Sequence, residues 1–449
     1  MATECHSRSG FRFQRKLVVD FKGGEITGDA GLVVLRQFDE RLGLTRGLGK
    51  IVADTRDRRY VSHSVLDLVR QRIYQIAAGY EDANDANFLR DDPAMRAVVD
   101  GVDRPLASQP TLCRLENSAD WESIRLLERE GLEWFCRMGG AIDGRRRDSC
   151  EEITLDIDSS EDPTHGQQEL AFFNGHYDSW MYHPLFIFEG GSGVLLSSRL
   201  RPGNVGGVRQ LLDILRPTVR RLRARFPKRP MAIRADGDFA KAPLLDYAEY
   251  AGCSYVIGMP RNSKLEAIVE PLRQKAEAEW KHSGGKSVRF YTSFSYQTRS
   301  WSRSRRIVAK VEYTVLGKNL RFVVTNRLGR AKEIFDWYEQ RGKAENFIKD
   351  LKNEIAADRL SCSAYRANAF RLQLHTLAYN LLVLFRRVVL RGTALASATI
   401  GTIRLRLLKV GARVVRSVRR LWFHLATGWP GQPLLLLVVD RLAEISGSL

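Results

Sequence analysis

The pattern that most constrains the fold begins just after residue 150, where apolar and polar residues alternate. From Ile153 to Asp158 every second residue is apolar, and two of the polar residues between them are Asp156 and Asp158. Such alternation predicts a strand with one apolar and one polar face. The patterns that follow predict strand, strand, helix, strand, helix and strand over 183–189, 194–200, 208–226, 231–235, 240–251 and 253–258.

This order of elements is that of a ribonuclease-H-like core, so the predicted fold class is α/β. Three strands with short connections form an antiparallel meander, and strands that follow helices add to the sheet in parallel. We expect the core to occupy residues 148–392, with a β-rich insertion at about 262–330. Strand patterns within the insertion lie over 288–296, 307–316 and 320–325.

Helical patterns predominate on both sides of this core. Residues 1–147 are predicted to be mostly helical after a strand-like opening at 11–21, and 143–148 is the expected linker to the core. A long apolar helix is predicted over 367–390, and residues 393–449 are predicted to form a basic helical region.

Charge restricts the partners of the chain. Of its 449 residues 71 are Lys or Arg and 52 are Asp or Glu, so the formal net charge is +19. Such an excess favours a polyanionic partner, most often nucleic acid, and makes the N-terminal region a candidate for DNA binding. A basic protein without such a partner stays the alternative.

Composition also excludes several classes of protein. A hydrophobic content of 44% excludes a disordered chain. The six cysteines have no Cys-x2-Cys spacing, which disfavours a zinc site or a disulfide framework. The first ten residues lack the apolar core of a signal peptide, and the longest uncharged stretch, Leu421–Val439, contains Gly-Trp-Pro-Gly-Gln-Pro. We therefore expect a cytoplasmic protein with no membrane partner.

Acidic residues occur on the three elements that converge in such a core. Asp158 lies on the first strand, Asp236 ends the fourth, and Glu345 lies on a helix after the insertion. Phosphodiester chemistry uses two divalent metal ions about 3.5–4 Å apart, and Mg²⁺ prefers carboxylate oxygens. The three carboxylates predict a site for two Mg²⁺ ions, with Mn²⁺ as a substitute. Asp156 stays an alternative for the first ligand.

The helix that carries Glu345 has a polar stripe. Tyr338, Arg341, Glu345 and Lys352 follow at i, i+3, i+7 and i+14, spacings that place all four on one face of a helix. A carboxylate, two cations and a phenol in one row favour contact with a charged ligand over a solvated surface.

This stripe resembles the YREK signature of bacterial insertion-sequence transposases of the DDE type, and it matches that signature at all four positions. The resemblance to the group-1 DDE-domain family covers most of the chain, and its further segments are Gln109–Arg114, Leu155–Glu169, Phe173–Asp178, Arg234–Phe239 and Ala378–Leu381. It implies that Asp158, Asp236 and Glu345 are the catalytic triad. Asp158 is preferred to Asp156 because Ser160 follows two positions later, as in the family pattern.

The resemblance also implies DNA partners and a division of labour. We expect cleavage at insertion-sequence ends, strand transfer into target DNA, and a homodimer that pairs the two ends beside the bacterial nucleoid. Tyr338, Arg341 and Lys352 are expected to bind DNA phosphates. Trp301, among the cations of the insertion, is expected to stack on a displaced base, with a solvated surface tryptophan as the alternative.

The C-terminal region lacks acidic residues from Arg359 to Val439. A basic amphipathic helix predicted from Arg404 to Leu421 carries Arg413, Arg416 and Arg420, which we expect to contact DNA phosphates regardless of sequence. A membrane-surface helix has the same pattern and stays an alternative.

Two functions from other classes compete with transposition. A stand-alone metal-dependent nuclease would cut DNA without joining it, and a catalytically decayed repressor would only bind the element. The intact acidic triad argues against decay.

Overall fold

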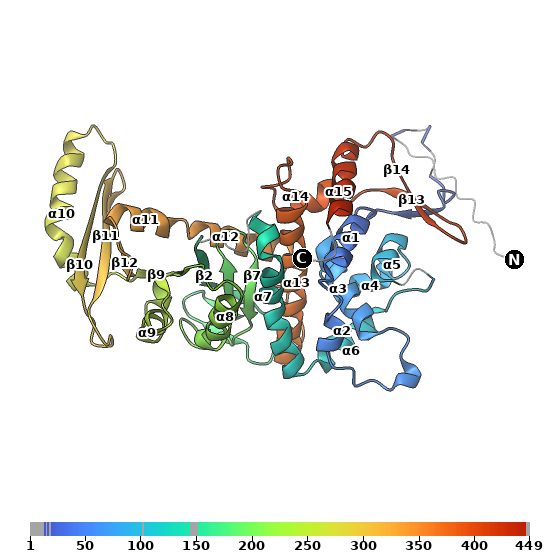
Figure 1. The fold of residues 1–449 in the computed structure, drawn as a ribbon, viewed down its shortest axis with the longest axis horizontal. Helices are drawn as coiled ribbons and strands as arrows, with labels where there is room; N and C mark the ends of the chain where they lie inside the picture. The colour runs from blue at the N-terminus through green and yellow to red at the C-terminus, as the bar shows by residue number, and fades with distance from the viewer. Residues whose placement is uncertain (1–12, 15, 18, 101–102, 144–150, 446–449) are drawn as a thin grey trace.

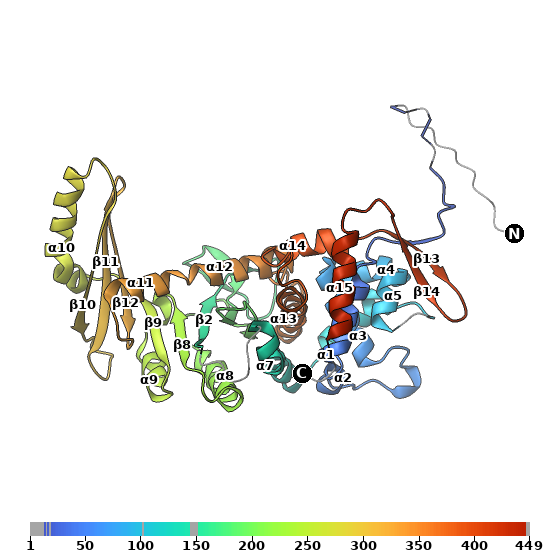
Figure 2. The same cartoon turned by 45° about the horizontal axis from the view of Figure 1, so that its top comes forward.

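An eight-stranded mixed sheet forms the middle and one end of the molecule (Figures 1 and 2). The computed structural model describes residues 13–445 apart from 15, 18, 101–102 and 144–150, so most of the predicted linker lies outside the described residues. The strand order is β10-β11-β12-β9-β8-β2-β6-β7. In chain order the strands are β2 (Ile153–Ser159), β6 (Leu185–Glu189), β7 (Leu195–Arg199), β8 (Met231–Ala235), β9 (Ser254–Met259), β10 (Val288–Tyr296), β11 (Arg305–Thr314) and β12 (Gly317–Thr325).

The half of the sheet around β2 has the predicted pairing. β2, β6 and β7 are antiparallel neighbours, whereas β8 pairs with β2 in parallel and β9 with β8 in parallel. Helices α8 (Leu211–Arg225) and α9 (Ala242–Tyr250) connect the parallel strands. The predicted order of a three-strand meander followed by parallel strands is confirmed. A second, three-stranded sheet of β3 (Asp162–Pro163), β5 (Ser179–Tyr182) and β4 (Phe172–Asn174) follows β2 and was not predicted.

The predicted insertion extends the main sheet. Its three strands form as expected, and β12 pairs antiparallel with β9. Helix α10 (Ser263–His282), which the sequence analysis missed, packs against β10 and β11. Its buried residues Leu265, Val269 and Ala276 have helical spacing, but Pro271 interrupts the pattern.

The N-terminal region is a cluster of helices. These are α1 (Leu32–Leu42), α2 (Leu48–Ile51), α3 (Val65–Ala78), α4 (Ala86–Leu89), α5 (Pro93–Val99), α6 (Gln109–Ser118) and α7 (Trp121–Asp143). The described residues of 11–21 form no strand of their own, so the predicted strand-like opening is wrong there. The long helix α13 (Tyr365–Val388), predicted at 367–390, packs on α3, α7 and β7, and thereby joins the N-terminal helices to the sheet (Figure 2).

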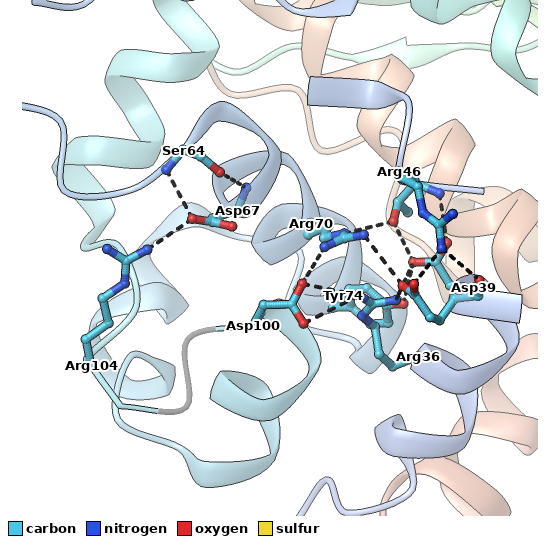
Figure 3. Close-up of polar contacts among 11 residues, drawn as sticks. Arg36, Asp39, Arg46, Ser64, Asp67, Arg70, Tyr74, Asp100 and Arg104 are labelled. Atoms are coloured by element: carbon cyan, nitrogen blue, oxygen red, sulfur yellow. Dashed lines mark hydrogen bonds and ion pairs between the residues drawn. The ribbon is translucent and has the colours of Figure 1, made fainter. Parts of the chain in front are cut away.

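Charged side chains of the N-terminal helices are paired with one another, and two of them, Asp39 and Arg70, are buried (Figure 3). Asp39 accepts hydrogen bonds from the Thr45 backbone at 2.8 Å and from the Tyr74 hydroxyl at 2.9 Å. Arg70 donates to Asp100 at 2.5 Å, and Arg36 contacts the same carboxylate at 3.2 Å. We name this set the N-terminal charge network. Its ion pairs tie α1 and α3 to the end of α5.

The predicted basic helix from Arg404 to Leu421 is wrong. A π-helical turn at Arg404–Leu408 leads into the hairpin of β13 (Ala412–Arg416) and β14 (Leu421–Leu425), and β13 pairs with β1 (Glu25–Thr27). The burial of Ala412 and Val414 on either side of exposed Arg413 has the period of a strand. After the hairpin, α15 (Gln432–Glu444) packs on α1. Among the described residues, no helix has the length and apolar character needed to cross a membrane.

Candidate active site

Asp158 and Asp236 lie side by side at the carboxyl ends of two parallel strands. Ile157 of β2 pairs with Ala235, the last residue of β8. Asp158 follows Ile157 and Asp236 follows Ala235. The backbone N–H of Asp238 donates to the Asp236 carboxylate at 3.0 Å, which caps the short 3₁₀ turn Gly237–Phe239 and fixes the side chain. Two distant segments thus present their carboxylates at one edge of the sheet.

Burial and mutual repulsion disfavour the charged forms of these carboxylates. Burial raises the pKa of Asp158 to about 7, and the nearby Asp236 and Glu345 carboxylates add to the rise while Arg341 opposes it. Burial, together with the Asp238 carboxylate, also raises the pKa of Asp236. A cation bound between the two buried carboxylates would favour their charged forms and so offset the effect of burial.

Arg341 connects the third acidic residue to this pair. Its Nη1 donates to Asp158 Oδ2 at 2.9 Å and its Nη2 to Glu345 Oε1 at 2.8 Å. The Glu345 side chain is 51% exposed, so solvent or a ligand reaches it freely. The guanidinium thus lies between the first and third predicted metal ligands. Among the described residues, no three His, Cys, Asp or Glu side chains are grouped closely enough to hold a metal ion.

Asp156 has a different role from Asp158, two residues away. Arg234 lies opposite it on β8 and binds both of its carboxylate oxygens, at 2.6 and 2.8 Å. Arg234 also donates to the Trp337 carbonyl at 2.8 Å and stacks over the Trp337 ring. Because this ion pair is buried and occupies both oxygens, Asp156 joins β2, β8 and α11 (Ala331–Glu339) and is not a free metal ligand.

The predicted polar stripe is interrupted and only partly assembled. α11 ends at Glu339, α12 (Gly342–Lys349) follows, and a π-helical turn occupies Asp350–Glu354. Tyr338, Arg341 and Glu345 line one groove together. Lys352 lies within the π turn and does not line this groove, and its Nζ donates to the Glu161 carbonyl at 2.9 Å.

The groove beside the carboxylates has a volume of about 620 Å³ and a basic wall. It runs between the end of β9, strand β12 and the helices α11 and α12, and Arg261 and Arg321 contribute to its lining. Gly258 lets Tyr338 approach, because a Cβ there would lie 2.5 Å from the phenol oxygen. Neither arginine was predicted from the sequence. The position of Arg261 just after β9, the third parallel strand, was the available signal for one of them.

A comparison with protein families identifies the chain. The family described as "Transposase DDE domain group 1" matches residues 10–446. The chain belongs to this transposase family. Its triad and stripe were the sequence features that pointed there.

No curated protein matches the chain. Among solved structures, a piggyBac transposase synaptic complex with hairpin DNA covers 85% of this chain and 80% of its own, with 13% sequence identity and a TM-score of 0.43.

Trp301 does not lie where the sequence predicts, on the surface of the insertion with its ring open to a displaced base. The residue is 5% exposed, and its ring packs edge-on against Tyr296 and under the Arg305 guanidinium. Arg305 is in turn bonded to Asp246 and Glu249. Neither a stacking platform nor a solvated surface tryptophan describes this buried ring, which instead anchors the insertion strand β11 to α9.

One further residue near the carboxylates was missed. Burial raises the pKa of Tyr177, and the Asp158 and Asp236 carboxylates add to the rise, so the phenol lies near these two aspartates. Its ring packs edge-on against His176 and His183, with centroid distances of 4.8 and 5.7 Å. Tyr177 belongs to the Phe173–Asp178 segment that carried the family resemblance, so a signal was present in the sequence.

Proposed function

We propose that this chain is a DNA transposase that cuts at the ends of its element and joins them to target DNA. The observation that carries the proposal is that Arg341 bonds to both Asp158 and Glu345, beside a groove with a basic wall, while Asp236 follows the strand next to Asp158. Membership in a transposase family supports the same function.

The proposal includes a ribonuclease-H-like core. The order β7-β6-β2-β8-β9, with antiparallel pairing on one side of β2 and parallel pairing on the other, supports it. In this arrangement the central strand carries Asp158 and its parallel neighbour leads into Asp236. A clamp formed by two strand ends is more rigid than one formed by loops.

The donor set suits Mg²⁺ or Mn²⁺. It consists of carboxylate oxygens, which hard divalent cations prefer, and burial raises the pKa of Asp158 and Asp236, so a bound cation would favour their charged forms. Asp158, Asp236 and Glu345 would hold two ions once Arg341 turns away from Asp158. Such ions supply activation of the attacking water or 3′-hydroxyl and stabilisation of the leaving 3′-oxygen.

The surrounding side chains would bind and orient the DNA strand. Arg341, released from the carboxylates, can grip a phosphate through two N–H groups, whereas Lys352 would act as a point charge. Arg261 and Arg321 would follow the backbone along the groove, and the Tyr338 hydroxyl would donate to a phosphate oxygen. A homodimer would hold the two ends together for joining.

An assay with labelled DNA tests the proposal. Purified protein is incubated with a 5′-labelled duplex carrying the element end, a plasmid target, and either Mg²⁺ or EDTA. We expect cleaved ends and joined products in Mg²⁺ alone. Cleavage without joining would favour the nuclease, binding without cleavage would favour the repressor, and full activity in EDTA would contradict a metal mechanism.

A further inference from the structure

The C-terminal hairpin presents a basic face that the catalytic proposal does not use. We call β13, the turn that follows it and β14 the ribbon (residues 412–425). It projects at the end of the molecule opposite α10 (Figures 1 and 2). β1 pairs only with Ala412–Val414, so beyond Val414 the described part of the ribbon is two-stranded. The turn closes where the Ser417 N–H donates to the Arg420 carbonyl at 2.9 Å.

The two faces of the ribbon differ in chemistry. Ala412 and Val414 are buried, whereas Arg413 and, across the ribbon from it, His424 are exposed on the outer face. Trp422 lies on the same face and is stacked with His424, with 7° between the ring planes. The outer face is therefore a preformed row of one cation and two flat rings.

Cations crowd the tip of the ribbon with little to neutralise them. Arg419 and Arg420 are exposed in the turn, and Arg420 lies over the Trp422 ring. Arg416 pairs with Asp103 at 3.1 Å, but that aspartate is itself almost fully exposed. Because no acidic residue occurs from Arg359 to Val439, the ribbon supplies no carboxylates of its own. This charge is complementary to a polyanion.

The base of the ribbon is fixed to the N-terminal helices. Lys409 forms an ion pair with Asp29 at 2.8 Å, and its ammonium lies 3.7 Å from the centre of the Tyr80 ring. The Ala30 N–H donates to the Val410 carbonyl at 3.0 Å. Lys409 therefore belongs to the scaffold, although it falls among the cations of the predicted basic helix. A ribbon held this way meets a ligand in one orientation.

We infer that the ribbon enters the major groove of duplex DNA and reads its sequence there. The two-stranded part of the ribbon, beyond Val414, has the width that the major groove admits. Arg413 and His424 lie at its base, where β1 pairs with Arg413. Arg413 and His424 would reach base edges, while Arg416, Arg419 and Arg420 bind phosphates on either side. The inference rests on the proposed function for its partner. It goes beyond that proposal because a ribbon that reads bases gives the protein a preference for certain DNA sequences. The basic helix predicted from the sequence would have contacted phosphates alone and given no such preference.

The test compares Arg413→Gln with Arg406→Gln, an exposed cation of the same charge outside the ribbon. The probes are a 40-base-pair duplex that the wild-type protein enriches from a randomised pool and a random duplex of equal length. Arg413→Gln should lower the ratio of specific to random affinity by about tenfold, the scale of one base contact. Arg406→Gln should leave the ratio unchanged. Thermal unfolding checks that both variants fold.

Three results would overturn the inference. They are a wild-type protein that enriches no sequence, an equal fall in both affinities for Arg413→Gln, and an unchanged DNA affinity with lost binding to anionic lipid vesicles. Arg419→Gln with Arg420→Gln should weaken both duplexes equally and flatten log K against log[salt] by roughly 2 units. A protein that reads sequence through Arg413 but fails to cut in Mg²⁺ would contradict the proposed function alone.

Discussion

The N-terminal charge network and the carboxylate cluster at Asp158 both bring acidic and basic side chains together, with opposite electrostatic results. Beside the network, Glu40 of α1 is a half-exposed carboxylate that accepts hydrogen bonds from Arg36 and Arg46, and these bonds lower its pKa. In the cluster, burial and neighbouring carboxylates raise the pKa of Asp158 to about 7 despite its bond to Arg341. At Glu40 two arginines stabilise the charged carboxylate, whereas at Asp158 burial disfavours it and a single arginine does not offset this.

The difference separates structural from functional charge. A buried ion pair with both partners satisfied holds elements together, and losing one partner is costly. Where several carboxylates share one arginine, an additional cation would be bound favourably. Burial raises the pKa of Asp156 as it does that of Asp158, but both Asp156 oxygens are bonded to Arg234. By its hydrogen bonds Asp156 therefore belongs with the network, although only one residue separates it from Asp158.

The largest expected effect comes from the triad. Asp158→Asn, Asp236→Asn and Glu345→Gln should each slow DNA cleavage by about a thousandfold or more, since a lost metal ligand costs several kcal/mol of transition-state stabilisation. DNA affinity should stay within about twofold of wild type, because the groove keeps its arginines. Cleavage rates and filter binding on the same duplex check this, and a variant that still cuts removes its residue from the triad.

Asp156→Asn should act on stability instead. It leaves Arg234 buried without its partner, which we expect to lower the free energy of unfolding by about 3–5 kcal/mol. Asp158→Asn should leave it unchanged or slightly higher, because a poorly neutralised charge is removed. Urea unfolding of the two variants measures the contrast. Equal losses would mean that the two aspartates do not differ in role.

Asp39→Asn should have a smaller effect, confined to stability. Asp39 accepts hydrogen bonds from Thr45 and Tyr74, and the amide of asparagine can accept only some of them. We therefore expect the free energy of unfolding to fall by about 1–3 kcal/mol. Once folded, the variant should cleave DNA at the wild-type rate. A loss of cleavage without a loss of stability would show that the network takes part in the reaction.

The sequence predicts the half of the fold that depends on local patterns. The strands from Ile153 to Met259 are short, regularly alternating and joined by short connections or helices, so their order could be inferred. The ribbon could not be inferred, because its residues also fit a helical spacing and its partner strand Glu25–Thr27 lies near the other end of the chain. Tertiary pairing decided between the two patterns.

The site was predicted in its residues but not in its contacts. Asp156 and Asp158 lie on the same face of one strand, so periodicity alone does not separate them. The separation comes from the parallel register that places Arg234 opposite Asp156. Similarly, the helical spacing that grouped Lys352 with Arg341 did not anticipate the π-helical turn between Glu345 and the end of the stripe.

Binding of Mn²⁺ tests most directly whether the poorly neutralised carboxylates form the metal site. Free Mn²⁺ can be followed by electron paramagnetic resonance as protein and uncut end duplex are titrated with the ion. We expect tight binding by the wild-type protein and by Asp39→Asn, and its loss in Asp158→Asn and Asp236→Asn. Equal Mn²⁺ binding by all four proteins would contradict the account.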